Sequence, residues 1–248
     1  MPSIGTHDYQ PAREIVVTTT GNIDDLDPDG ASLIIMNNSS LSTIRGIKTG
    51  YAGKRISIVS IGAGNVELAH QNINSSASNR LINLLTSTNT LLVAGTGWAS
   101  YIYDATTLKW RLLDYSQGDW IEVPYNAGNF TGNTGTWTVD LADQIAFKYK
   151  ITRLSMKIQF NFQFTDVQNT GDFLRATIPG GYTIGGTGTI TGLIRSADAG
   201  AATVMGFSRA TAGTTYIEFR SSLSGAGYTA TTGDNTAVIG EVEFEIQP

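Results

Sequence analysis

Hydrophobic and polar residues alternate most regularly between Arg153 and Val167. Alternation with a two-residue period is typical of a β-strand that buries one face and exposes the other. The apolar positions are Leu154, Met156, Ile158, Phe160, Phe162 and Phe164. At about 3.3 Å per residue such a strand is roughly 40 Å long, so its aromatic face needs a second layer to cover it. The stretch therefore predicts the central strand of a β-sandwich core.

The residues before this strand predict a β-hairpin module. Short apolar runs are separated by clusters of Asn, Ser and Gly, and this spacing favours strands that follow one another as hairpins. The predicted strands are residues 14–20, 32–37, 41–48, 54–61, 66–70, 91–94, 98–103 and 108–113. The last two flank Asp104 to Thr107, which predicts a hairpin with a short loop. Residues 79–85 fit neither period well, so a helical turn and a further strand both stay open.

The residues after position 137 predict a jelly-roll-like or related β-sandwich. Its further strands are expected at residues 144–151, 173–178, 188–195, 203–210, 214–220 and 236–246. The final strand alternates again, with Val238, Val242, Phe244 and Ile246 on one side and Glu241, Glu243 and Glu245 on the other. A row of like charges on the wet face discourages pairing between exposed sheet edges.

These patterns together predict an all-β chain with two modules. Residues 1–13 are polar and contain Pro2 and Pro11, which predicts an extended N-terminal arm. Residues 14–124 form the first β module, and residues 137–248 form the β-sandwich head. Residues 125–136 are rich in Gly and Asn without an apolar period, so the domain linker is placed there.

Composition narrows the classes of function. The 248 residues include 28 Gly, only 15% are charged, and the formal charge of -5 leaves no broad basic surface for nucleic acid. The chain has no cysteine, which excludes disulfides, thiolate metal sites and cysteine nucleophiles. We expect no signal peptide, because the N-terminus has no charged start followed by an apolar core. We expect no membrane insertion, because no apolar run approaches the ~20 residues of a membrane span.

Three glycine-containing passages resemble ligand-binding loops without completing the pattern. Asp25 to Gly30 matches the start of a calcium loop, but Met36 occupies the twelfth position, where a bidentate Glu is needed. Gly46 to Lys54 lacks the spacing of a phosphate loop. Gly185 to Gly188 lacks the strand and helix of a dinucleotide fingerprint. Ordinary turns are the expected reading of all three.

Candidate catalytic groups are equally sparse. Only His7 and His70 could act as imidazole bases, and neither has a metal-type residue at ligand spacing. Ser208 lies in the sequence GFSRA, which is not a nucleophile elbow. Two acidic residues could still serve a glycoside hydrolase, and sequence does not forbid this. We therefore predict no catalytic, cofactor-binding or metal-binding residue, and an enzyme ranks third among the functions considered.

Several aromatic residues leave two interpretations open. Trp98 and Trp110 lie at the ends of the predicted hairpin and are expected to pack against neighbouring strands, although a sugar-stacking platform is the alternative. Tyr182, Tyr216 and Tyr228 are expected on loops of the second module. They are expected to pack within or between subunits, and an adhesin would instead use them to bind sugar.

Parts of the first module resemble β-domains of tailed-phage virion proteins, especially fibre and appendage proteins. The resemblance is carried by residues 25–40, 44–70, 79–82 and 97–113. The second module, from GTWTV at 135–139 through IPGGYTIGG at 178–186 to the final strand, resembles the β-sandwich heads of phage fibres and capsid spikes. Such heads usually assemble as trimers, so the resemblance implies a homotrimer.

We therefore expect a non-enzymatic structural protein on the surface of a phage virion, assembled in the host cytoplasm. Its N-terminal part would attach to other virion proteins, and its C-terminal head would project outward. The short chain without a heptad shaft favours capsid decoration or a head fibre. The alternative is a tail-fibre or receptor-binding protein that attaches to a host surface glycan, and the third possibility is a polysaccharide-degrading enzyme.

Overall fold

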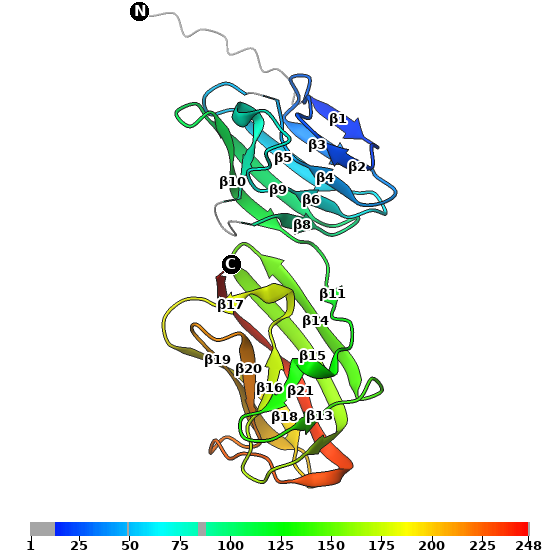
Figure 1. The fold of residues 1–248 in the computed structure, drawn as a ribbon, viewed down its shortest axis with the longest axis vertical. Coiled ribbons are helices and arrows are strands. Elements are labelled where there is room, and N and C mark those ends of the chain that lie inside the picture. The colour runs from blue at the N-terminus through cyan, green and yellow to red at the C-terminus, as the bar shows by residue number, and fades with distance from the viewer. Residues whose placement is uncertain (1–12, 49, 84–87, 248) are drawn as a thin grey trace, which may run out of the picture. The chain divides into compact units, whose positions relative to one another are not determined.

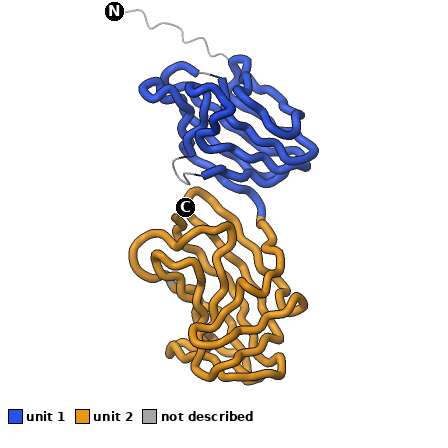
Figure 2. Tube along the Cα trace, in the orientation of Figure 1, with its two compact units in different colours: residues 1–119 blue, residues 120–248 orange. Residues whose placement is uncertain are grey.

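The computed structural model describes residues 13–48, 50–83 and 88–247, and these residues confirm an all-β fold. The chain forms two compact units, residues 1–119 and residues 120–248 (Figure 2). The arm predicted for residues 1–13 lies outside the described residues except for Arg13. The unit boundary falls before residue 124, where the first module was expected to end.

Within each of two sheets, the first six strands of unit 1 run parallel to one another, so the predicted series of hairpins is wrong (Figure 1). One parallel set is β1, β3 and β5, and the other is β2, β4 and β6. Their bounds are β1 Glu14–Val17, β2 Gly21–Ile23, β3 Leu33–Met36, β4 Ser42–Ile44, β5 Arg55–Ser60 and β6 Val66–Leu68. The chain thus winds in successive coils, and each coil gives one strand to each sheet. Turn composition predicts where strands end, but it does not say which strand pairs with which.

Buried side chains and close backbone contacts hold the coils together. Apolar residues from both sheets are fully buried, among them Ile34, Met36, Ile44, Ile58, Val66 and Leu68. At one corner, the buried Asn38 side chain donates hydrogen bonds to the carbonyls of Ser40 at 2.6 Å and Asn65 at 3.0 Å. A side chain at Gly64 would collide with the backbone of Ser40, so glycine is needed where successive coils meet.

Four more strands complete unit 1, three of them in antiparallel pairs and one, at residues 81–82, parallel to its neighbour. β7 spans Leu81–Ile82, β8 Thr90–Leu92, β9 Trp98–Asp104 and β10 Lys109–Ser116. The predicted hairpin is confirmed, because β9 and β10 pair antiparallel around a loop at residues 105–108. Within residues 79–85, left open by the sequence, a short 3-10 turn η1 (Ala77–Asn79) leads into β7, and residues 84–87 lie outside the described part.

Unit 2 is a rolled antiparallel sheet in the order β14, β15, β21, β18, β19, β20, β16, β12 (Figure 1). Its elements are β11 Ile121–Glu122, η2 Ala127–Asn129, β12 Phe130–Gly132, β13 Trp137–Thr138, β14 Gln144–Thr152, β15 Ser155–Val167, β16 Leu174–Thr177, η3 Pro179–Gly181, β17 Thr183–Ile184, β18 Thr189–Ala197, β19 Val204–Thr211, β20 Tyr216–Arg220 and β21 Thr231–Gln247. Rings from β15 and β20 meet inside the roll, where the Phe160 and Phe219 centroids lie 4.9 Å apart. This arrangement is sandwich-like, and the jelly-roll detail stays a prediction.

The passage 125–136 is part of unit 2 and not the linker that its composition predicts. It contains η2 and β12, and β12 pairs antiparallel with β16. Phe130 is buried and packs edge-on against Trp137 and Phe162, with centroids 5.4 and 5.0 Å away. Phe130 thus packs this segment against the core. The Gly and Asn residues around it leave no apolar period from which a strand could be predicted.

The central strand β15 follows its predicted alternation as far as Phe162. Met156, Ile158, Phe160 and Phe162 are buried, but Phe164 is 57% exposed. The pairing with β21 shifts register between Phe162 and Thr165, and Phe164 has φ 60°. This bulge puts one extra residue into the strand and turns Phe164 outward. The expectation that Phe164 faces the core is therefore wrong.

The final strand β21 confirms the predicted faces. Val238, Val242, Phe244 and Ile246 are buried, and Glu241, Glu243 and Glu245 are exposed. β15 pairs with β21 along one side, and on the other side β18 pairs with Ala237 to Gly240 and β17 with Ile246 and Gln247. Glu241 forms an ion pair with Lys157 at 2.6 Å.

Candidate functional site

The outer face of β16, β19 and β20 carries a dense group of charged side chains in unit 2. On β20 the residues alternate, so that Ile217 and Phe219 are buried in the core while Glu218 belongs to the opposite face. The strand register places Glu218 directly between Arg175 on β16 and Arg209 on β19. Sequence positions that are far apart therefore converge on one carboxylate.

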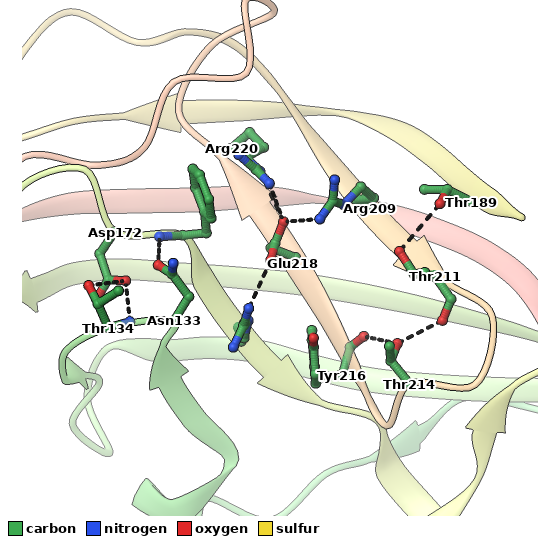
Figure 3. Close-up of polar contacts among 12 residues, drawn as sticks. Asn133, Thr134, Asp172, Thr189, Arg209, Thr211, Thr214, Tyr216, Glu218 and Arg220 are labelled. Atoms are coloured by element: carbon green, nitrogen blue, oxygen red, sulfur yellow. Dashed lines mark hydrogen bonds and ion pairs between the residues drawn. The ribbon is translucent and has the colours of Figure 1, made fainter.

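Three arginines surround the Glu218 carboxylate (Figure 3). Its Oε1 accepts hydrogen bonds from Arg220 Nη2 at 2.6 Å and Arg220 Nε at 3.0 Å, and lies 2.9 Å from Arg209 Nη2. Its Oε2 accepts from Arg175 Nη2 at 3.2 Å. The Glu218 side chain is only 4% exposed, whereas the Arg209 side chain is 41% exposed. We call these four residues the arginine cluster.

Aromatic rings fix two of the guanidinium groups. The Arg220 guanidinium lies over the Phe173 ring, 3.1 Å from its centroid, and the Arg175 guanidinium lies over Tyr216 at 4.5 Å. Arg220 Nη1 also donates to the Gly225 carbonyl at 3.2 Å. Planar guanidinium groups stack well on aromatic faces, and this contact limits their rotamers. The cluster is therefore preorganised.

A buried aspartate holds the loop beside the cluster. Asp172 is fully buried, and its carboxylate accepts hydrogen bonds from the backbone N–H groups of Thr134 at 2.9 Å and Gly135 at 3.0 Å. Next to it, the Phe173 N–H donates to Asn133 Oδ1 at 2.7 Å (Figure 3). These contacts fix the start of β16 and with it the ring that supports Arg220. Asp172 is thus a structural carboxylate.

The chemistry of the cluster favours binding over catalysis. Both oxygens of Glu218 are occupied by guanidinium donors, so its carboxylate is not placed to attack a substrate or to deliver a proton. Three positive groups face one negative group, which leaves a surplus of positive charge. Arginine matches the geometry of carboxylate and phosphate oxygens. An oxyanion is therefore the ligand class that this face suits.

The three tyrosines suggested for sugar binding do not form one platform. Tyr228 is fully buried, and its hydroxyl accepts a hydrogen bond from Ser196 Oγ at 3.0 Å. Burial raises the pKa of Tyr228 and, less strongly, that of Tyr182, which is half-buried. Tyr216 is also half-buried and lies under Arg175. Only Tyr216 belongs to the arginine-rich face.

The two tryptophans of the first hairpin differ. Trp110 is fully buried, and its Nε1 donates to the Ile47 carbonyl at 2.9 Å, so the packing interpretation is confirmed for this residue. Trp98 is 37% exposed at the start of β9. The pair therefore does not form an exposed stacking platform.

The calcium-like passage is a turn whose carboxylates have separate protein partners. Asp25 accepts from the Ser76 hydroxyl at 2.7 Å, Asp27 pairs with Lys48 at 2.7 Å, and Asp29 pairs with Arg13 at 3.3 Å. Among the described residues, no group of three or more His, Cys, Asp or Glu side chains is placed to hold a metal ion.

The remaining sequence candidates have structural surroundings. His70 Nδ1 accepts a hydrogen bond from the Asn83 N–H at 3.0 Å, and burial together with the Lys109 charge lowers its pKa. His7 lies outside the described residues. The buried Ser208 donates its hydroxyl to the Gly192 carbonyl at 3.3 Å. Gly46 abuts Ser75, and the Gly185 N–H donates to the Glu245 carbonyl at 2.7 Å, while Gly186 to Gly188 form an exposed bend between β17 and β18.

Sequence reasoning missed the arginine cluster because its members lie on three strands whose pairing was not predictable. A local signal exists in the sequence YIEFR at 216–220, where Glu218 and Arg220 alternate with Ile217 and Phe219. This alternation places the two charges on one outer face. It does not reveal Arg175 or Arg209 on the neighbouring strands.

The comparisons with known proteins add no family. No protein-family model matches the sequence, and no curated protein matches it. In the described part of the chain, no helix has the length and hydrophobicity that crossing a membrane requires.

Proposed function

We propose that this chain is a non-enzymatic structural protein on the surface of a phage virion. It forms a homotrimer, is held to other virion proteins by its N-terminal part, and presents unit 2 outward as a capsid decoration or head fibre. The observation that carries this proposal is an exposed apolar strip on the outer face of β18 and β19. There Leu193 is 65% and Met205 44% exposed, on neighbouring strands. Apolar side chains grouped on a surface favour burial against a partner protein.

Localisation on the particle tests this proposal. Labelled antibody against unit 2 should decorate the capsids of intact virions in electron micrographs. Particles that lack the protein should keep their tails and lose thermal stability. A protein absent from purified virions would overturn the proposal, and decoration confined to tail tips would overturn the capsid location.

Assembly is tested separately in solution. The full chain should sediment as a trimer, and the double substitution Leu193→Lys with Met205→Lys should shift it toward monomer, because each charge would be buried at the contact. Leu108→Lys, at an exposed position of unit 1, is the matched control. A wild-type chain that sediments only as a monomer contradicts the trimer.

The second candidate is a receptor-binding protein, and the arginine cluster specifically favours it. A preorganised group of arginines on an outer face suits recognition of charged groups on a host surface glycan. Purified protein should then block adsorption of the phage to its host. A capsid-decoration protein should leave adsorption of the phage unchanged. Cleavage of host polysaccharide by the purified protein would contradict both proposals in favour of an enzyme.

A further inference from the structure

We propose that the outer face of β16, β19 and β20 binds the oxyanion of an acidic saccharide through Arg175, Arg209 and Arg220. The inference rests on the receptor-binding candidate and names the class of ligand that this protein would recognise. The oxyanion is a carboxylate, phosphate or sulfate attached to a sugar. The oxyanion would accept hydrogen bonds from guanidinium N–H groups that do not contact Glu218.

Charge is the first reason. Glu218 neutralises one of three guanidinium groups, although the chain as a whole carries a formal charge of -5. Arg209 is the most exposed of the three, and its guanidinium group points toward Glu218 (Figure 3). A surplus of positive charge held at fixed positions attracts an anion more strongly than separate surface charges do, because its side chains lose less entropy on binding.

Hydrogen-bond capacity is the second reason. A guanidinium group has more N–H donors than a carboxylate has oxygens, so three arginines cannot all be satisfied by Glu218. The Nε atoms of Arg175 and Arg209 are buried and have no hydrogen-bond partner. Buried donors without acceptors are costly. The N–H groups that Glu218 leaves without an acceptor therefore favour a ligand that supplies oxygens.

The position within the sheet favours a saccharide over an acidic peptide. β20 pairs with β16 on one side and β19 on the other, so no backbone edge is open there to receive a peptide strand. Recognition must come from outward side chains alone. The same face carries threonine hydroxyls that can bond to sugar hydroxyls, at Thr177, Thr189, Thr191 and Thr211.

A hollow beside the cluster has room for part of a sugar ring. It has a volume of about 280 Å³ and is lined by Thr191, Gly192, Leu193, Phe207 and Leu223. Phe207 pairs with Arg220 in the strand register, so the hollow adjoins the cluster directly. Sugar sites commonly combine an apolar wall with a few placed polar groups. In a receptor-binding protein this hollow supplies the wall and the arginines supply the polar groups, so Leu193 there lines the sugar site and not a contact between subunits.

Calorimetric titration of the full chain tests the inference with matched sugars. Methyl glucuronide, glucose 6-phosphate and glucose 6-sulfate supply the three oxyanions, and methyl glucoside is the neutral control. Inorganic phosphate reports the oxyanion without the sugar. We expect at least one acidic sugar to bind, to bind more tightly than inorganic phosphate, and to weaken as salt is added, while methyl glucoside does not bind.

Substitutions at two arginines make the test specific. Arg209→Gln should weaken binding of the acidic sugar about tenfold or more, because it removes a hydrogen bond to a charged group. Arg209→Lys keeps the positive charge but loses the forked pair of N–H donors, so its affinity for the acidic sugar should lie between those of the wild type and Arg209→Gln. Arg195→Gln, at an exposed arginine on β18 of the same face, should leave binding unchanged. Glu218 keeps Arg175 and Arg220 as partners in the Arg209 variants, so these variants should fold.

Four outcomes would overturn the inference. These are equal binding of acidic and neutral sugars, no binding of any acidic sugar, an equal loss in Arg209→Gln and Arg195→Gln, and preferential binding of a polyglutamate peptide. Adsorption assays separate this inference from the function on which it rests. If wild-type protein blocks adsorption and Arg209→Gln blocks it equally, the receptor-binding function stands and this site fails. If wild-type protein binds the acidic sugar without blocking adsorption, the site stands and that function fails.

Discussion

Thr165 shows how one buried hydroxyl can organise an aromatic core. It is fully buried, and its Oγ1 accepts a hydrogen bond from Trp137 Nε1 at 2.9 Å while donating to the Thr236 carbonyl at 3.1 Å. Trp137 in turn packs edge-on against Phe162 and Phe219, with centroids 5.5 and 5.9 Å away. The hydroxyl therefore supplies the acceptor that a buried indole requires.

Replacing Thr165 with valine should lower the free energy of unfolding by about 1–3 kcal/mol, because the Trp137 N–H would stay buried without a partner. Thr236→Val is the matched control. Thr236 is equally buried, but its own Oγ1 has no hydrogen-bond partner, so valine should leave stability unchanged or raise it. Denaturation followed by tryptophan fluorescence measures both. Equal losses in the two variants would show that the Trp137 hydrogen bond is not the cause.

Asp104 gives unit 1 a pH dependence. It accepts from Arg111 Nε at 2.6 Å and from the Thr107 hydroxyl at 2.8 Å, and these bonds hold its pKa well below the ordinary value. A carboxylate with a depressed pKa adds stability above its unfolded pKa of about 3.9 and loses that contribution as pH falls through the folded pKa. Asp104→Asn should therefore destabilise at pH 7 and progressively less below pH ~4. A constant difference between the two proteins from pH 7 to pH 3 would contradict this linkage.

At the scale of the element, β15 separates what alternation predicts from what it does not. The two-residue period correctly identified the strand and four of its buried positions, from Met156 to Phe162. It failed at Phe164 because a bulge depends on the partner strand β21, whose register shifts there. The predicted hairpins of unit 1 were wrong for the same reason, because strand pairing there is parallel. Strand content is local in sequence, whereas pairing is decided by the whole chain.

Truncation of two phenylalanines in β15 should lower the stability by very different amounts. Phe162→Ala should cost about 3–5 kcal/mol, because Phe162 is fully buried among rings of the core. Phe164→Ala should change stability by less than about 0.5 kcal/mol, because Phe164 is largely exposed. Phe164→Gly should be at least as stable as Phe164→Ala, since glycine adopts φ 60° without strain. Urea denaturation compares the three, and a large loss in Phe164→Ala would place its ring in the core.

At the scale of the whole molecule, composition predicted the all-β class and two units but misplaced their boundary. Gly and Asn residues around Phe130 were interpreted as a linker, although β12 completes the sheet of unit 2 beside β16. The candidate site could not be predicted at all from spacing, because Arg175, Arg209 and Arg220 meet only when three strands are correctly ordered. Sites built across a sheet are therefore less accessible to sequence reasoning than sites built from one loop.

Two fragments test where the second unit begins. Residues 120–248 should fold alone with a cooperative unfolding transition, because their strands pair with one another around a shared aromatic core. Residues 137–248, which start at the end of the predicted linker, lack β12 and Phe130. This shorter fragment loses the strand partner of β16 and leaves a hole beside Trp137 and Phe162. Near-ultraviolet circular dichroism and urea denaturation should show a lower midpoint or no cooperative transition. Equal midpoints for the two fragments would mean that residues 120–136 add nothing to the core and that the compositional boundary is the physical one.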